Sequence, residues 1–171
     1  MKLDELPPVE VMCEGKFVRA LKRGKWEYAS RANEIRAVVI LAEHDGKTIL
    51  IDQPRVPLGA RCVELPAGLV GDVDPDATVE ATAVKELEEE TGFTAERIEV
   101  LGEFYSSPGM LSEGFTLVRA HGVRRIGEGG GDEHEDIAVH LVARAEIPNF
   151  LEQKRAEGFG IDVKLLMFLD Y

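Results

Sequence analysis

Hydrophobic and polar residues alternate along residues 9–30, in two extended runs that flank the sequence Lys22-Arg23-Gly24-Lys25. Alternation with a period of two is typical of strands that bury one face, and a short polar stretch containing glycine is typical of a turn. The pattern therefore predicts a hairpin or a small antiparallel sheet, attached to the main domain as an appendage.

Two continuously apolar runs follow, at residues 36–41 and 48–52, and Asp45-Gly46 lies between them. Short apolar runs of this kind are typical of buried strands, and Asp-Gly between two such runs favours a tight hairpin turn. We expect these two strands to lie in the core sheet.

Residues 68–76 hold three aspartates, two glycines and a proline, which predicts a loop. The loop leads to a predicted helix at residues 78–91, with Gly92 as its stop. The rest of the chain is predicted to form extended runs at 98–105 and 115–123, a polar loop at 127–136, a strand at 137–143 and helical segments at 147–157 and 163–169. Because strands and helices interleave, the expected fold class is α/β, an α/β/α layered domain with a mixed sheet and a small N-terminal antiparallel β appendage.

Length and composition bound the organisation of the chain. Its 171 residues, 44% of them apolar, allow one sizeable core and a small appendage but not two full domains. We predict an N-terminal β region at residues 1–33 and one main domain at residues 34–171. The chain has no apolar run of membrane-spanning length and no signal-peptide core at its N-terminus, so a cytoplasmic protein without a membrane partner is expected. Cys13 and Cys62 are expected to be reduced and inert.

The charge balance limits the classes of partner. The net charge is −12, from 32 acidic and 20 basic side chains, which disfavours nonspecific binding of nucleic acid. No nucleic-acid partner is therefore expected. A small anionic substrate needs a local bridge of metal ions or arginines, because a cleft rich in carboxylates otherwise repels phosphate.

Carboxylates are concentrated in the predicted helix, in the sequence Lys85-Glu86-Leu87-Glu88-Glu89-Glu90-Thr91-Gly92-Phe93. Glu86, Glu89 and Glu90 stand at positions i, i+3 and i+4, so their side chains share one face and repel one another. A divalent cation would remove that repulsion, and Mg2+ commonly bridges carboxylates to substrate phosphates. The cluster therefore predicts metal and phosphate chemistry, with a solvated acidic helix face as the alternative.

The same stretch resembles the second half of the Nudix signature, Arg-Glu-apolar-any-Glu-Glu-any-Gly-apolar, and the match is complete from Glu86 onward. The resemblance implies a Nudix-type α/β/α sandwich. Two positions depart from the signature: Lys85 replaces its arginine, and Ala77 replaces the glutamate eight positions earlier. The opening glycine is ambiguous, since Gly71 fits the strict spacing and Gly68 fits the Pro-Ala-Gly context.

Segments upstream of the helix resemble the ADP-ribose pyrophosphatase branch of this family. Asp52-Gln53-Pro54-Arg55-Val56-Pro57 and Glu64-Leu65-Pro66-Ala67-Gly68 look like the strand, arginine and Glu-Leu-Pro-Ala-Gly entry of that branch. The resemblance implies that Arg55 binds a substrate phosphate, and Glu64 is taken as a further substrate-binding residue. It also implies that the carbonyl of Ala67 is a metal ligand together with Glu86 and Glu90. The planar guanidinium of an arginine suits a diphosphate, although a surface ion pair is the alternative.

Segments downstream of the helix extend the resemblance. Ser107-Pro108-Gly109-Met110-Leu111-Ser112-Glu113 resembles the Ser-Pro-Gly loop of the branch, which makes Glu113 a candidate substrate contact. Residues 132–140 look like its acidic loop, which implies Glu133 as the general base and Glu135 as an additional metal ligand, with the two roles open to exchange. Glu89 is kept as a second catalytic candidate. Gly129-Gly130-Gly131 just upstream suggests a mobile loop that closes over bound substrate.

The branch also suggests a role for the N-terminal strands, which in its members cross to a second subunit, form a homodimer and help to hold the adenine. Trp26 and Tyr28 alternate onto one side of a predicted strand, so either is a candidate for stacking on the base. Packing within the small sheet is the alternative for both aromatic residues. A homodimer is expected.

The resemblance implies hydrolysis of a nucleoside diphosphate sugar, with ADP-ribose and water giving AMP and ribose 5-phosphate. The reaction would use Mg2+, or Mn2+ in its place, to activate the attacking water. GDP-mannose, NADH and dinucleoside polyphosphates are alternative substrates, because the signature reads the diphosphate and the metal rather than the attached groups. A non-catalytic Nudix-fold nucleotide sensor is the alternative outside enzymes; Ala77 and Lys85 hint at it, and the three helix glutamates argue against it.

Overall fold

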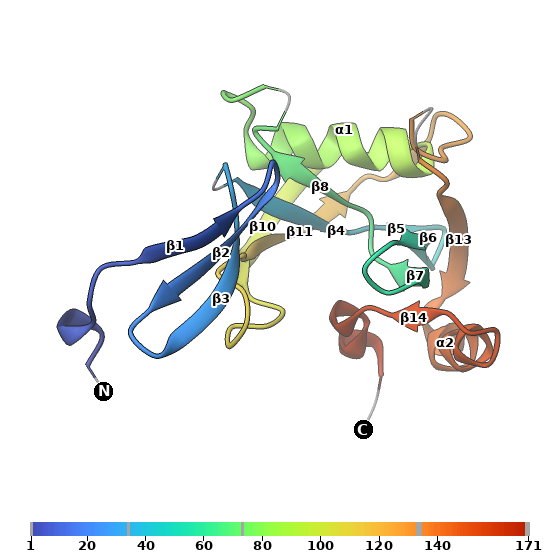
Figure 1. Cartoon of the computed structure of the whole chain (residues 1–171). Coiled ribbons are helices and arrows are strands. Elements are labelled where there is room, and N and C mark those ends of the chain that lie inside the picture. The colour runs from blue at the N-terminus through green and yellow to red at the C-terminus, as the bar shows by residue number, and fades with distance from the viewer. Residues whose placement is uncertain (1, 34, 73, 133–134, 170–171) are drawn as a thin grey trace.

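The layered arrangement predicted from the sequence is present in the computed structural model, which describes residues 2–33, 35–72, 74–132 and 135–169. Helix α1 (Val79–Thr91) lies on one side of the central strands, and helix α2 (Ile147–Ala156) lies on the other side (Figure 1). The α/β fold class is thereby confirmed. Within the described ranges, no helix has the length and apolar character needed to cross a membrane.

The central strands form two mixed sheets rather than the single sheet predicted. In the first sheet the two central strands run parallel to each other, whereas the two outer pairs are antiparallel. The order across this sheet is β10 (Arg97–Phe104), β11 (Phe115–His121), β4 (Arg36–Leu41) and β8 (Ala67–Val70).

The second sheet is antiparallel except at one edge, where the last strand is added in parallel. The N–H of Ile40 in β4 donates to the carbonyl of Pro66 (2.8 Å), which lies in the connection from this second sheet to β8 of the first. The order is β13 (Ala138–Ala143), β6 (Lys47–Arg55), β7 (Ala60–Glu64) and β14 (Gly160–Ile161), and β5 (Glu43–His44) also pairs with β6. The remaining elements are the strand pair β9 (Phe93–Thr94) and β12 (Arg124–Arg125) and the 3-10 helices η1 (Leu3–Glu5), η2 (Arg144–Glu146) and η3 (Val163–Phe168).

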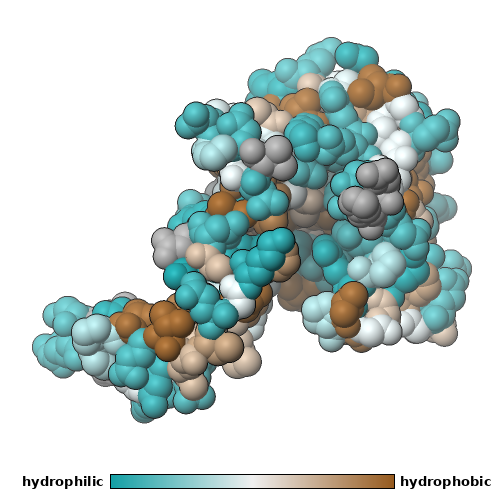
Figure 2. All heavy atoms as spheres, turned by 45° about the horizontal axis from the view of Figure 1, so that its top comes forward, coloured by the Kyte–Doolittle hydropathy of each residue, from teal (hydrophilic) through white to brown (hydrophobic). Residues whose placement is uncertain are grey.

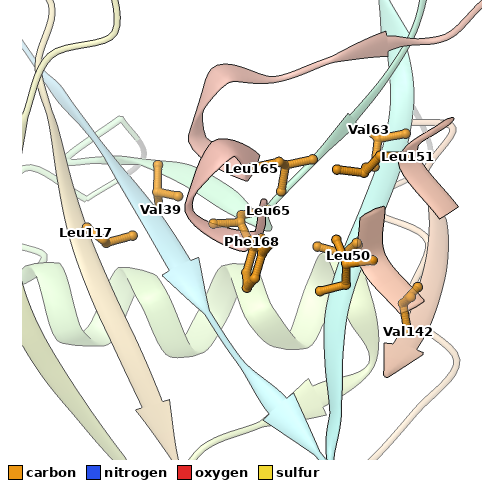
Figure 3. Close-up of a cluster of buried hydrophobic side chains, with 10 residues drawn as sticks. Val39, Leu50, Val63, Leu65, Leu117, Val142, Leu151, Leu165 and Phe168 are labelled. Carbon is orange, nitrogen blue, oxygen red and sulfur yellow. The ribbon is translucent and has the colours of Figure 1, made fainter. Parts of the chain in front are cut away.

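Alternation along β4 builds a core on each face of the strands. Val38 and Ile40 are fully buried against the apolar side of α1, which contributes Leu87. Val39 points to the opposite face and belongs to a second cluster, which includes Phe168 of η3. Figure 3 shows this second cluster, in which apolar side chains of the strands meet those of the C-terminal helical segments. Both helical layers are therefore anchored on strands that the apolar runs of the sequence predicted.

Helix α1 begins and ends where the sequence predicted. The side chain of Thr78 accepts a hydrogen bond from the N–H of Ala81 (3.2 Å), which caps the N-terminus. Gly92 ends the helix in the left-handed conformation with φ of 74°, and its N–H donates to the carbonyl of Glu88 (3.0 Å). Local interactions thus fix both ends of α1, the helix that carries Glu86, Glu89 and Glu90.

Two predicted segments differ from the structure. The loop predicted at 68–76 begins only at Gly71, because residues 68–70 continue strand β8 and pair with β4. The segment predicted as helical at 163–169 is the 3-10 helix η3. Residues 68–70 are extended because they pair with β4, which is distant in sequence and leaves no signal in the local composition.

The N-terminal region is the small antiparallel sheet predicted, with three strands: β1 (Glu10–Glu14), β2 (Val18–Arg23) and β3 (Trp26–Arg31). It projects from the rest of the molecule (Figures 1 and 2). Strand β3 holds it to the main body, because the N–H of Ala29 donates to the carbonyl of Met110 (2.9 Å) and the N–H of Ser112 donates to the carbonyl of Ala29 (3.0 Å). A domain boundary after residue 33 stays a prediction.

Candidate active site

A cleft of about 600 Å3 lies between α1, strand β8 and the end of β6. Six of the residues predicted as functional line it, although they come from four separate stretches of the chain: Arg55, Ala67, Glu86, Glu89, Glu90 and Glu135. The fold therefore collects on one surface most of the side chains that the sequence singled out.

Glu90 is the buried carboxylate of the cleft, with a relative exposure of 3%. The N–H of Ala67 at the start of β8 donates to its Oε2 atom (3.0 Å). Burial raises the pKa of Glu90 to about 8; the hydrogen bond from Ala67 opposes the rise, and the charges of Glu86 and Glu135 add to it. A carboxylate in this position is costly to ionise unless a cation stands beside it.

Glu86 stands one helical turn before Glu90 and is half-buried. Burial raises the pKa of its carboxyl, the charge of Lys85 counteracts this, and Glu89 and Glu135 raise it further. The mutual effect of these carboxyls shows that they lie close enough to repel one another. The helical spacing predicted from the sequence is thus realised on the wall of the cleft.

The donor set suits a hard divalent cation. Among the described residues, no three His, Cys, Asp or Glu side chains are grouped closely enough to hold a metal ion by themselves. Mg2+ commonly needs fewer protein ligands, because it keeps several waters and is bound through one or two carboxylates plus substrate phosphates. Glu86 and Glu90, beside the backbone of Ala67, fit that mode of binding.

The two glycines that could open the signature are constrained in different ways in the structure. A Cβ on Gly68 would lie 2.2 Å from the Cγ and Cδ atoms of Glu86, so any side chain there would displace this glutamate. Gly71 has φ of +86°, and the neighbours of a Cβ there would be 3.9 Å away. Gly68 is therefore required by the packing of the site, whereas Gly71 is required by the turn of its own backbone.

Arg55 is held in the cleft by Glu64. Its Nε and Nη2 atoms donate to the two carboxylate oxygens of Glu64, each at 2.7 Å. The side chain of Glu64 is 7% exposed and that of Arg55 is 45% exposed, so the guanidinium stands on a buried support and faces the cleft. Its charge also opposes the rise in the pKa of Glu90, which shows that the guanidinium lies near this carboxyl. Glu64 is among the residues that support the cleft without lining it.

Two residues of the predicted acidic loop, Asp132 and Glu135, line the cleft. The Oε2 atom of Glu135 accepts a hydrogen bond from the N–H of Asp132 (3.2 Å). Glu133, the predicted general base, lies outside the described residues. Glu89, the other catalytic candidate, lines the cleft and forms an ion pair with Lys85 (2.7 Å), four residues earlier on α1.

The remaining predicted substrate contacts among the described residues do not line this cleft. A second cavity of about 530 Å3 is lined by residues that include Tyr28 and Glu113, and Glu113 forms an ion pair with Arg31. Trp26 is 45% exposed and is not among the described residues that line either cavity. Arg31 lines both cavities, and sequence reasoning missed it because it lies on the alternating strand β3 without a motif around it.

Comparison with known proteins identifies the family of the chain. A family model described as the NUDIX domain matches residues 32–159. An ADP-ribose pyrophosphatase from Bacillus subtilis is 45% identical over 78 residues, which are 45% of this chain and 40% of that protein. A methanol dehydrogenase activator from Bacillus methanolicus is 35% identical over 119 residues, 68% of this chain and 62% of that protein. This chain thus spans less than two thirds of either relative.

Two further similarities extend over most of the chain. A GDP-mannose pyrophosphatase from Cronobacter sakazakii is 33% identical over 158 residues, which are 87% of this chain and 78% of that protein. The crystal structure of an ADP compounds hydrolase matches with a TM-score of 0.70 and 24% identity, over 95% of this chain and 90% of that one, which supports the fold. The chain belongs to the Nudix family, and within that family it is similar to ADP-ribose pyrophosphatases.

Proposed function

We propose that this protein is a hydrolase that splits the pyrophosphate of a nucleoside diphosphate sugar with Mg2+ or Mn2+, converting ADP-ribose to AMP and ribose 5-phosphate. The observation that carries the proposal is the joint presence on one cleft of a supported arginine, Arg55, and the carboxylates of Glu86, Glu90 and Glu135. A diphosphate needs both kinds of group, because its own charge repels bare carboxylates.

The proposed roles follow from the positions of the side chains. Glu86 and Glu90 would hold the cation, with the carbonyl of Ala67 and the carboxylate of Glu135 as further ligands. When bound, the cation supplies an activated water and neutralises phosphate oxygens. Arg55, fixed by Glu64, binds a phosphate oxygen and orients the diphosphate across the cleft.

Proton transfer is assigned to residues of the acidic loop and of α1. Glu133 is the proposed general base, which accepts a proton from the attacking water. Glu89 is the second candidate, and its ion pair with Lys85 holds its carboxylate on the wall of the cleft. A positioned base of this kind typically contributes about 10² to 10⁴ in rate.

The nucleoside and the second subunit are assigned to the N-terminal region. Tyr28 and Glu113 line the cavity beside the cleft, and Arg31 lines both, which supports a path for the substrate from one to the other. The N-terminal sheet exposes apolar side chains that favour a homodimer: Val9, Val11, Met12, Phe17 and Val18. Trp26 stays a candidate for base stacking from a partner subunit.

A sugar nucleotide with another base is the second candidate substrate, because the GDP-mannose pyrophosphatase from Cronobacter sakazakii aligns over 87% of this chain. A nucleotide sensor without turnover is the third candidate, supported only by Ala77 and Lys85 at positions where the family signature has other residues.

One assay separates these candidates. The purified protein is incubated with ADP-ribose, GDP-mannose, NADH and a dinucleoside polyphosphate, each with Mg2+, with Mn2+ or with EDTA, and the products are resolved by chromatography. AMP and ribose 5-phosphate formed fastest from ADP-ribose would support the proposal. Faster release of GMP from GDP-mannose would move the assignment to that substrate. Calorimetric binding of a nucleotide without turnover of any compound would replace the hydrolase with a sensor.

A further inference from the structure

The glycine segment, defined here as residues 127–131, is docked against the carboxyl end of α1. The N–H of Gly130 donates to the carbonyl of Glu90 (2.9 Å), and the N–H of Gly131 donates to the carbonyl of Glu89 (3.0 Å). The N–H of Gly127 donates to the carbonyl of Gly92 (3.0 Å). The sequence suggests a mobile loop here; in the structure these three backbone hydrogen bonds hold the segment against the end of the helix.

The two helix carbonyls that accept these bonds belong to residues of the cleft. The last carbonyls of an α-helix have no partner within the helix and need one from outside. The glycine segment supplies that partner for Glu89 and Glu90, whose side chains line the cleft. Its position is therefore set directly against the backbone that carries these carboxylates.

The glycines are required by close approach as well as by conformation. Gly129 has φ of +73°, and a Cβ on it would lie 2.3 Å from the carbonyl carbon of Thr91. A Cβ on Gly92 would lie 2.5 Å from the carbonyl oxygen of Gly127, so the helix end and the segment interlock. A Cβ on Gly131 would lie 2.5 Å from the Oε2 atom of Glu135, so this carboxylate packs directly against the segment.

A second anchor holds the chain on the far side of Glu135. Arg61 of β7 donates from Nη1 to the carboxylate of Asp136 (2.6 Å) and from Nη2 to its carbonyl (2.9 Å). Arg61 is itself held by an ion pair with Asp52, which is 1% exposed and also accepts from Nε2 of His140 (2.6 Å). Glu135 thus lies between one anchor on α1 and another on the second sheet.

We propose that the glycine segment and Arg61 are positioning residues that hold Glu135 on the same cleft as the carboxylates of α1, so that Glu135 is within reach of a cation bound by the helix. This inference rests on the proposed function, because it assigns Glu135 to the same cation. Arg55 lies on β6 and is supported by Glu64, outside both anchors. A variant that weakens either anchor should therefore impair Mg2+ binding and turnover more than it impairs binding of the diphosphate.

The test is Gly129→Ala, with Gly46→Ala as the matched control. Gly46 has φ of +72°, almost the value at Gly129, but a Cβ there would meet none of the described residues within 4 Å. Both variants acquire the same backbone strain, and only Gly129→Ala must push the segment away from Thr91. Far-UV circular dichroism and thermal unfolding establish that each variant is folded.

Gly129→Ala is expected to lower kcat about 10- to 100-fold and to raise the Mg2+ concentration for half-maximal activity, with KM for ADP-ribose changed by less than about threefold. Mn2+ binding measured by calorimetry without substrate should weaken in parallel, whereas Gly46→Ala should match the wild type in all of these measurements. A folded Gly129→Ala with wild-type kcat, Mg2+ requirement and Mn2+ affinity would overturn the proposal, as would an equal loss in Gly46→Ala.

Arg61→Lys decides the matter if Gly129→Ala does not fold. It keeps a positive charge beside Asp52 but loses the planar fork that reaches both atoms of Asp136. The same shift in Mg2+ requirement and Mn2+ affinity supports the proposal, and wild-type values overturn it. A wild type without turnover on any substrate would defeat the proposed function alone, since the Mn2+ binding comparison still tests the positioning.

Discussion

The substitution Glu90→Gln distinguishes the effect of the buried charge on folding stability from its proposed role in binding a cation. Among the described carboxylates that line the cleft, Glu90 is the most buried, at 3% exposure. The glutamine amide is nearly isosteric with the carboxylate, and its oxygen can still accept the N–H of Ala67. The change therefore removes the charge with little effect on shape.

The pKa shift sets the size and the pH window of the effect. Glu90 has a pKa of about 8 in the folded protein against the ordinary 4.5, so the folded state binds the proton more tightly than the unfolded state. Stability is unaffected by this group below pH 4.5, falls as the pH rises towards 8, and then levels off. At 1.36 kcal/mol per pKa unit the loss amounts to at most about 5 kcal/mol for the metal-free protein.

The assay is urea unfolding of wild type and Glu90→Gln in EDTA at pH 4.5, 7 and 9. The two proteins should be about equally stable at pH 4.5, and at pH 9 the variant should be more stable by a few kcal/mol, up to the full 5 or so. Added Mg2+ should stabilise the wild type at pH 9 more than the variant, because ligand bound to the folded state adds to stability. The variant should have lost almost all turnover.

Glu88→Gln is the control, since Glu88 lies on the same helix but is not among the described residues that line the cleft. Its stability difference from the wild type should not follow the pH profile of Glu90→Gln. The reasoning is refuted if Glu90→Gln is no more stable than the wild type at pH 9 in EDTA, or if the difference is the same at all three pH values. Wild-type turnover in Glu90→Gln at saturating Mg2+ would show that the proposed metal site is wrong.

Three further predictions concern the other groups of the site. Glu64→Gln should raise KM more than it lowers kcat, because the guanidinium of Arg55 loses its charged support; an unchanged KM in steady-state kinetics would contradict this. Glu133→Gln should lower kcat by about 10² to 10⁴ with little change in KM. The loss of activity in Glu135→Gln should be partly rescued by a higher Mg2+ concentration. Full activity in both variants would show that these residues belong to an ordinary solvated acidic loop. Deletion of residues 1–30 should give monomers or aggregates, because the exposed apolar residues of the N-terminal sheet are expected to be covered in a homodimer; light scattering that shows the intact chain to be monomeric at micromolar concentration would disprove the dimer.

Local periodicity determined the parts of this protein that depend on neighbours along the chain. The spacing of Glu86, Glu89 and Glu90 placed three carboxylates on one helix face, and Thr78 and Gly92 marked the ends of that helix. The continuously apolar runs at residues 36–41 and 48–52 likewise predicted strands that bury residues on both faces. These features could be read from the sequence because a helix or a strand repeats its geometry every few residues.

Tertiary structure decided everything that depends on contact between distant segments. The sequence offered Gly68 and Gly71 equally, and only the approach of β8 to Glu86 shows which of them the site requires. It presented Arg55 and Glu64 as two substrate contacts, whereas the fold makes the second the support of the first. Composition suggested only a mobile loop at residues 129–131, whereas the structure shows that the absent side chain of Gly129 permits a close approach to the end of α1. The physical reason is that a glycine permits both freedom and close contact, and only the surface packed against it determines which of the two the protein uses.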